Sequence, residues 1–330
     1  MKTFFDTKSL PFLIDCDPGA DDVFALLWSL VLHNKRATPL QLKAITTVGG
    51  NVSSDHTYSN AFKMLEFTGT TDIPVGKDMR PVMGSANASH IHGEDGIGGL
   101  SSLLPPVNLP SETLNSVDLI IKTIKENPGL TILATGPLTN LAAAERKEPG
   151  ILTQCQYIIA MGGASQVGGN VTPVAEFNIW YDAPSADIVV KACNNLILIP
   201  LDVTTSFVYS PEETEAIVGQ VNHSTKAQFI RELTQFTINT NRKFRETHYN
   251  NGFFVHDAHT IGFLAYPHLY KGSFVDLAVE TVGEHTKGQT VVDRRNHPRS
   301  NINKTLLITD VDRNGILEAM TEDLKEFDFE

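Results

Sequence analysis

Short apolar runs alternate with longer apolar or amphipathic stretches along most of the chain. The first apolar run covers residues 11–14, and a Pro-Gly turn separates it from a longer apolar run over 23–32. A short run bounded by turn residues is typical of a buried strand, whereas the longer run is typical of a helix. The pattern therefore predicts a strand, a tight turn and a helix at the start of the chain.

The same alternation continues beyond this first unit. Short β-branched runs that end in Gly, Pro or Asn predict strands over 42–48, 73–75, 130–134, 157–161 and 196–201. Helices are predicted over 54–67, 111–127, 185–193, 211–220, 225–247 and 314–327, with another after residue 140. Later strands are predicted over 277–282, 290–293 and 305–308. Strands alternating with helices predict an α/β fold with a doubly wound, mostly parallel central sheet and helices on both faces, in a single domain covering 1–330.

Composition narrows the class of protein. The 330 residues are 41% hydrophobic and 19% charged, with a formal net charge of −12 and no basic run. Nucleic acids and anionic membrane surfaces are therefore not expected as partners, because both bind clustered Lys and Arg. The three cysteines are scattered, and neither a signal peptide nor a membrane-spanning apolar stretch is recognisable. A cytoplasmic protein is expected.

Four carboxylates crowd the turn after the first predicted strand: Asp15, Asp17, Asp21 and Asp22. Asp21 and Asp22 fall in the first helical turn, where the backbone amides favour negative charge. Like charges about 4 Å apart repel by roughly 4 kcal/mol at a surface-like dielectric, so either protons stay bound or a cation lies among them. Oxygen ligands favour calcium or magnesium over zinc.

Polar residues also follow the later predicted strands. Asn51 and Thr135 end two of them, and Asn170, Glu176 and Asn178 follow a third. Ligands of doubly wound sheets bind beyond the carboxyl ends of the strands. The sequence thus predicts a polar site at this edge of the sheet.

The stretch D-x-D-P-G-x-D-D at 15–22 resembles the aspartate signature of the nucleoside hydrolases, the calcium-dependent N-ribohydrolases of the inosine-uridine-preferring family. Further segments are similar to family motifs in the family's order: 47–51, 135–140 (T-G-P-L-T-N), 172–178 (with A-E-F-N), 255–257 (with H-D) and 288–293. The resemblance covers nearly the whole chain. It implies a Rossmann-like enzyme, a homodimer or homotetramer, that cleaves ribonucleosides to ribose and free base.

The resemblance also implies a role for each matched residue. A Ca²⁺ ion would be bound by Asp17, Asp22, Asp257 and the backbone carbonyl of Thr135, with Asp15 as support behind Asp17. Asp17 would also be the general base that deprotonates a metal-bound water. A carboxylate-rich pocket suits the positive charge that develops on the sugar when this bond breaks.

Substrate contacts are implied in the same way. The ribose 2′- and 3′-hydroxyls would be held by Asp21, Asn51 and Asn178, and the 5′-hydroxyl by Asn170 and Glu176. The match at Asn170 is the weakest of these, since the loop before it is a residue longer than the family pattern.

The leaving base would be faced by His256, and His92 could instead supply the proton. His248 and Tyr249 occupy positions where family members often carry base-contacting residues.

Plainer roles remain open for the histidines. His256 would alternatively orient Asp257, His90 and His92 would lie on a loop surface, and His248 with Tyr249 would end a solvated helix. The i, i+2 spacing of His90 and His92 does not predict zinc, because no third nitrogen or thiolate lies nearby.

Two other functions keep part of the pattern. A haloacid-dehalogenase-type phosphatase also begins with D-x-D after a strand, but Asp21 and Asp22 would add negative charge beside its phosphate. A non-catalytic calcium- or ribose-binding protein would keep the metal and lose the chemistry. The stretch 310–315 imitates an EF-hand loop but lacks its final Glu, so Asp312 is expected to cap the last helix instead.

Overall fold

The computed structural model describes residues 9–35, 38–78, 87–206, 208–219, 221, 223–244, 250–295 and 304–330. Its strands are β1 (Leu10–Cys16), β2 (Leu40–Thr47), β3 (Val75–Lys77), β4 (Leu114–Asn115), β5 (Thr131–Ala134), β6 (Tyr157–Met161), β7 (Leu196–Ile199), β8 (Tyr270–Val279), β9 (Thr290–Asp293) and β10 (Lys304–Val311). Within the described residues they form one ten-stranded sheet in the order β4-β3-β2-β1-β5-β6-β7-β10-β8-β9.

The helices are α1 (Asp22–Asn34), α2 (Ser54–Thr68), α3 (Ser89–His92), α4 (Ser116–Glu126), α5 (Thr139–Lys147), α6 (Phe177–Tyr181), α7 (Ala183–Ala192), α8 (Leu201–Thr204), α9 (Pro211–Val218), α10 (Thr225–Phe244), α11 (Ala258–Ala265) and α12 (Arg313–Leu324). Strands β1 to β7 and β10 pair in parallel with their neighbours among these strands, whereas β8 and β9 are antiparallel additions at one edge. The predicted doubly wound, mostly parallel sheet is confirmed.

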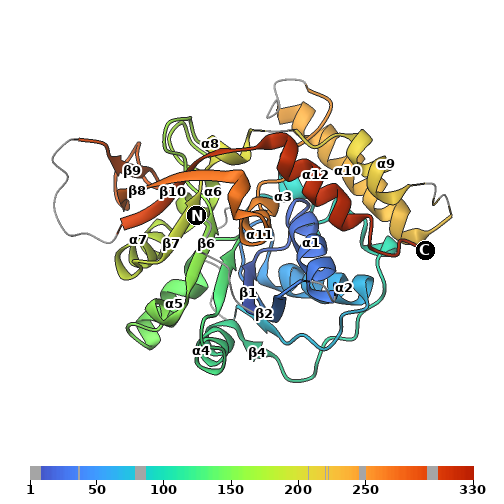
Figure 1. Cartoon of the computed structure of the whole chain (residues 1–330), viewed down its shortest axis with the longest axis horizontal. Coiled ribbons are helices and arrows are strands. Elements are labelled where there is room, and N and C mark those ends of the chain that lie inside the picture. The colour runs from blue at the N-terminus through green and yellow to red at the C-terminus, as the bar shows by residue number, and fades with distance from the viewer. Residues whose placement is uncertain are drawn as a thin grey trace.

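Strand β1 shows how the sheet separates two hydrophobic cores. Successive side chains of a strand point to opposite faces, so Phe12 and Ile14 enter one core and Leu13 enters the other. The first core is shared with α1, α2 and α12, and the second with α4, α5 and α7, on the two sides of the sheet in Figure 1. Each fully buried Leu, Ile or Phe side chain contributes about 1.5–3 kcal/mol. These cores hold the carboxyl end of β1 rigidly in place.

Several element boundaries differ from the sequence prediction. The helix expected from 111 begins at Ser116, because Leu114–Asn115 forms β4 and the Asn115 side chain accepts hydrogen bonds from Val117 N and Asp118 N. Helices α6, α8 and α11 were not predicted, since each is too short to show a clear period. Asp312 caps α12 as expected, accepting from Gly315 N.

The long polar stretch before α4 is only partly irregular. It contains α3 and a 3-10 turn at Ser101–Leu103.

Within the described residues, no helix combines the length and apolar character needed to span a membrane.

Candidate active site

The signature aspartates lie where β1 ends between its two parallel neighbours, β2 and β5. Asp17 is 1% exposed, and its Oδ2 accepts a hydrogen bond from Asn51 N at 2.7 Å. Its carboxylate also lies against Gly50 and Gly136, where any Cβ atom would overlap it. The absence of a side chain at these two glycines, in the segments 47–51 and 135–140, therefore leaves room for the Asp17 carboxylate.

Asp22 is fully buried and accepts three hydrogen bonds. Gly19 N and Asn51 Nδ2 donate to Oδ2 at 3.0 and 3.1 Å, and Thr135 Oγ1 donates to Oδ1 at 2.8 Å. Burial, followed by the negative charge of Asp21, raises the pKa of Asp22 to about 7. Asp22 is thus fixed in place but costly to ionise without a cation.

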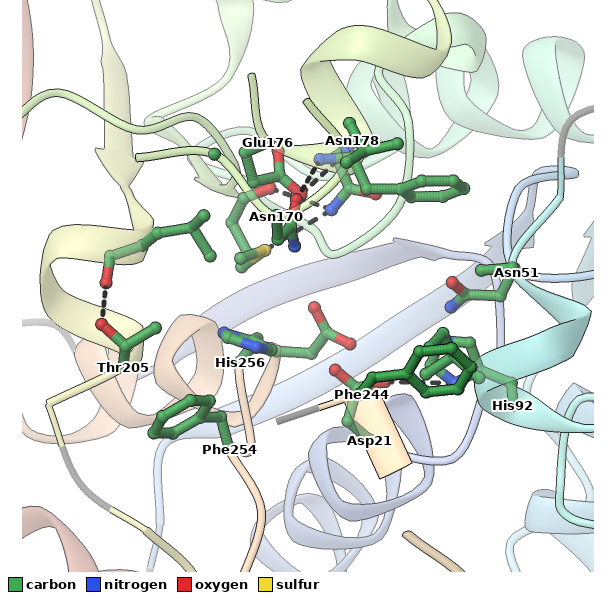
Figure 2. Close-up of a pocket in the computed structure, with 18 of the residues that line it drawn as sticks. Asp21, Asn51, His92, Asn170, Glu176, Asn178, Thr205, Phe244, Phe254 and His256 are labelled. Atoms are coloured by element: carbon green, nitrogen blue, oxygen red, sulfur yellow. Dashed lines mark hydrogen bonds and ion pairs between the residues drawn. The ribbon is translucent and has the colours of Figure 1, made fainter. Parts of the chain in front are cut away.

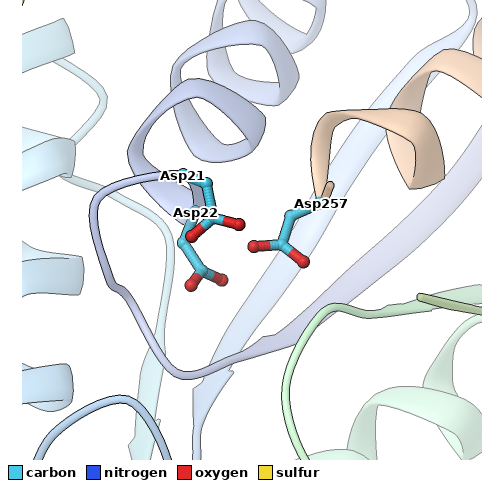
Figure 3. A group of neighbouring side chains, drawn as sticks. All are labelled: Asp21, Asp22 and Asp257. Atoms are coloured by element: carbon cyan, nitrogen blue, oxygen red, sulfur yellow. The ribbon is translucent and has the colours of Figure 1, made fainter. Parts of the chain in front are cut away.

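Asp257, at the start of α11, completes an acidic group with Asp21 and Asp22. One carboxylate oxygen from each lies within 4.8 Å of the others, and the three converge from two segments far apart in the sequence (Figure 3). Burial, followed by the charge of Asp21, raises the pKa of Asp257, and burial with the charge of Asp22 raises that of Asp17. Three oxygen donors that repel one another fit a hard divalent cation.

Two predicted ligands lie beside this group without belonging to the closest cluster. Asp17 is coupled electrostatically to both Asp22 and Asp257 but is held toward Asn51. The Thr135 carbonyl accepts from Asn178 Nδ2 at 2.8 Å. Asp21, expected at the ribose, lines the cavity and also contributes an oxygen to this acidic group.

Asp15 is buried behind this group. Its Oδ1 accepts from Thr46 Oγ1 and Asn140 Nδ2, both at 2.7 Å. The side chain therefore joins β1, β2 and α5 below the site, which fits the supporting role predicted for it.

A cavity of about 730 Å³ opens above the carboxyl ends of the strands (Figure 2). It brings together predicted residues from every segment: Asp21, Asn51, His92, Thr135, Asn170, Glu176, Asn178, His256 and Asp257. Asp17 and Asp22 are not among its lining residues and lie buried.

One wall of the cavity is built around α6. Glu176 caps this helix, accepting from Asn178 N (2.8 Å), Ile179 N (3.2 Å) and Gly163 N (2.9 Å). Burial raises the Glu176 pKa, and these backbone bonds oppose the rise. Asn170 Oδ1 accepts from Phe177 N at 2.9 Å, which ties the glycine-rich loop to the helix.

Two histidines face the cavity, each with one ring nitrogen engaged by the protein. His92 Nδ1 accepts from Ala20 N at 3.1 Å, and it lies 3.8 Å from Asp21 Oδ1. His256 Nδ1 lies 2.7 Å from Thr204 Oγ1. Burial lowers the pKa of both imidazoles.

Apolar residues that the sequence did not single out also line the cavity. They are Ile91, Phe177, Trp180, Leu201, Phe244 and Phe254. The Phe244 ring meets that of His90 at 5.4 Å between centroids. Thr237 and Asn241 share a face of α10 with Phe244, a spacing that could have revealed them. The predicted base contacts His248 and Tyr249 lie outside the described residues.

Comparison with known proteins gives this arrangement a family. A family model for inosine-uridine preferring nucleoside hydrolases matches residues 12–318. The chain therefore belongs to this family of enzymes. It is a ribonucleoside hydrolase, which cleaves nucleosides to ribose and free base, and the phosphatase and non-catalytic alternatives are excluded.

Individual relatives match over nearly their whole length. The pyrimidine-specific ribonucleoside hydrolase RihA of Shewanella woodyi is 36% identical over 322 residues, covering 96% of this chain and 98% of the relative. RihA of Escherichia coli K12 is 35% identical over 326 residues, covering 96% and 99%.

Solved structures show the same fold. A plant nucleoside hydrolase, PpNRh1, superposes with a TM-score of 0.85 at 29% identity, covering 96% of this chain and 99% of that one. The purine-preferring ribonucleoside hydrolase from Gardnerella vaginalis gives a TM-score of 0.85 at 26% identity, covering 96% and 98%.

Proposed function

We propose that the chain hydrolyses pyrimidine ribonucleosides with the aid of a bound calcium ion. The observation that supports metal dependence is the convergence of Asp21, Asp22 and Asp257 beyond the carboxyl end of β1. The pyrimidine preference is supported by the curated relatives at 35–36% identity, which are named as pyrimidine-specific.

The cation would be held by Asp17, Asp22, Asp257 and the Thr135 carbonyl, as the family resemblance implies. When bound, such an ion supplies Lewis-acid activation of a water and an anchor for sugar hydroxyls. Asp17 is suited to take the proton from that water, because its burial beside Asp22 raises its pKa.

The sugar would be held by acceptors whose orientation is already fixed. Nδ2 of Asn178 donates hydrogen bonds to the carbonyls of Thr135 and Met161. Nδ2 of Asn51 donates to Asp17 O and Asp22 Oδ2. The Oδ1 atom of each amide therefore remains to accept from a ribose hydroxyl. Together with Asp21, these groups support recognition of the 2′- and 3′-hydroxyls.

The 5′-hydroxyl and the base would occupy opposite parts of the cavity. Asn170 and Glu176 remain the proposed contacts of the 5′-hydroxyl, on the α6 wall. His256 and His92 are proposed to face the leaving base, and the aromatic residues around them suit a planar heterocycle.

Ribose release tests this function directly. Reducing sugar is measured from uridine, cytidine and inosine, first with purified enzyme and then after removal of metal by a strong chelator. We expect faster release from the two pyrimidine nucleosides, loss of activity with chelator, and recovery with Ca²⁺ but not Zn²⁺. Full activity in chelator would refute the metal requirement, and faster release from inosine would refute the pyrimidine preference.

We also propose a cytoplasmic homodimer or homotetramer. All three cysteines of the chain are free and buried, which suits a reducing compartment. Phe274 and Val282 are 62% and 88% exposed, which leaves apolar surface for a second copy to cover. Light scattering after size exclusion should give a mass of two or four chains, and a monomer would contradict this.

A further inference from the structure

Helix α8 is a single turn that directly follows β7 at the carboxyl end of the sheet. Leu201 N donates to Gly163 O at 2.9 Å. The Asp202 carboxylate accepts from Ser165 N and Gln166 N at 2.8 and 2.7 Å. Contacts with residues 163–166 thus hold both the backbone and a side chain of this turn in place.

Thr204, on this turn, is fully buried, and its Oγ1 lies 2.7 Å from His256 Nδ1. The neighbouring Thr205 gives its hydroxyl hydrogen to Leu201 O. For the Thr204 hydroxyl, Nδ1 of His256 is the one hydrogen-bond partner in the described part of the chain. Either ring tautomer fits this contact, but only donation by Thr204 gives its buried hydroxyl hydrogen an acceptor. On that assignment Nδ1 accepts, and the proton of a neutral imidazole lies on Nε2.

Because buried Thr204 engages Nδ1 of His256, Nε2 is the ring nitrogen that remains for a ligand in the cavity. His256 lines the cavity, and in the view of Figure 2 its ring lies between Phe254 and Asp21. The Phe254 ring packs beside the imidazole at 5.6 Å between centroids. An Nε2–H group held in this way points a hydrogen-bond donor at whatever occupies the cavity.

We propose that Thr204 is a positioning residue, which fixes the tautomer and orientation of His256 so that Nε2–H is directed at the departing base. This inference rests on the proposed function. As the bond between C1′ and the base nitrogen breaks, its electron pair stays on the base, and an aligned N–H donor stabilises that charge. Without the hydroxyl, the ring can rotate or present an unprotonated Nε2.

The test compares Thr204→Val with Thr204→Ser on two substrates. Valine keeps the shape of threonine without the hydroxyl, and serine keeps the hydroxyl. The uracil of uridine needs a hydrogen-bond donor to stabilise it as it leaves, whereas p-nitrophenyl β-D-ribofuranoside releases a stable phenolate without such a donor. The ratio of the two rates in one sample does not depend on the fraction of folded protein.

For Thr204→Val we expect kcat on uridine to fall by about tenfold to 100-fold, with KM little changed, and the rate on the nitrophenyl riboside to change less than about twofold. Thr204→Ser should stay within about threefold of wild type on both. Equal losses on both substrates would show a merely structural role and overturn the proposal, as would an unchanged rate on uridine.

The proposed function is judged separately by the unmodified enzyme. Turnover of uridine by wild type together with a uridine-selective loss in His256→Ala would support the role of His256. If Thr204→Val then matched wild type, only the inference about Thr204 would fail. Absence of turnover of either substrate by wild type would overturn both.

Discussion

Thr135 donates its hydroxyl hydrogen to Asp22 Oδ1 at 2.8 Å, joining two family motifs that lie 113 residues apart in the chain. The bond connects the end of β5 to the first turn of α1. It supplies one of three donors to a buried carboxylate that the proposed metal site needs in its charged form. Thr135 would thus serve the same site twice: its hydroxyl orients Asp22, and its carbonyl is a proposed ligand of the cation.

Removing this hydroxyl should weaken metal binding while leaving the carbonyl in place. For Thr135→Val we expect the calcium concentration for half-maximal activity to rise by about 10-fold to 100-fold, because groups that orient metal ligands have effects of this size. Thr135→Ser is the matched control and should stay close to wild type. Calcium titration of ribose release gives both values, and equal calcium dependence of Val and Ser variants would contradict the role.

Replacing Asp17 should abolish catalysis without unfolding the protein. Asp17→Asn keeps the acceptor for Asn51 N and removes the base, so kcat on uridine should fall by a factor of about 1,000 or more. Asp118→Asn, an exposed carboxylate 58% accessible in its side chain, is the control and should change the rate by less than about twofold. Thermal melting checks that both variants fold. Turnover at the wild-type rate in Asp17→Asn would remove Asp17 from the mechanism.

The sequence predicted which polar residues meet but not how they pair. Asn51, Asn178 and Asp257 follow strands or open helices, so the rule for parallel sheets was enough to bring them together. The pairing of Asp17 with Asn51 N, which leaves Asp21 in the acidic group, depends on side-chain packing against Gly50 and Gly136.

Contacts between residues far apart in the chain were also not predicted from the sequence. Thr204 lies on a four-residue helix with no readable period, and its contact with His256 spans 52 residues. Such a pair is set by the crossing of two segments in space, which a local pattern does not encode. The edge strands β8 and β9 were placed roughly, but their antiparallel pairing was not predicted.

The effect of calcium on stability should depend on pH. Burial raises the pKa of Asp22 from 3.8 to about 7, so without a cation the folded state keeps a proton that the unfolded state has lost. Its stabilising contribution is full below about pH 4 and is lost as the pH rises through about 7. Cation binding requires the deprotonated form and therefore strengthens over the same range.

We accordingly expect the rise in melting temperature on adding calcium, relative to chelator, to be larger at pH 8 than at pH 5.5. Taking the difference at each pH matters, because the histidines with lowered pKa act in the opposite direction in the metal-free protein. Asp22→Asn should give little calcium response at either pH. A wild-type response that is equal at the two pH values would contradict the linkage.

Substrates that lack the 2′-hydroxyl should be poor. Asn51 and Asn178 each present an oxygen whose amide orientation is locked, and a proposed cation would bind the vicinal hydroxyls. Loss of one hydroxyl leaves such buried polar groups unpaired, which costs about 1–3 kcal/mol. We expect kcat/KM for 2′-deoxyuridine to be roughly 100-fold below that for uridine. Arabinosyluracil, with the hydroxyl inverted, is the matched control and should be equally poor, and comparable values for uridine and deoxyuridine would show that the sugar is held in another way.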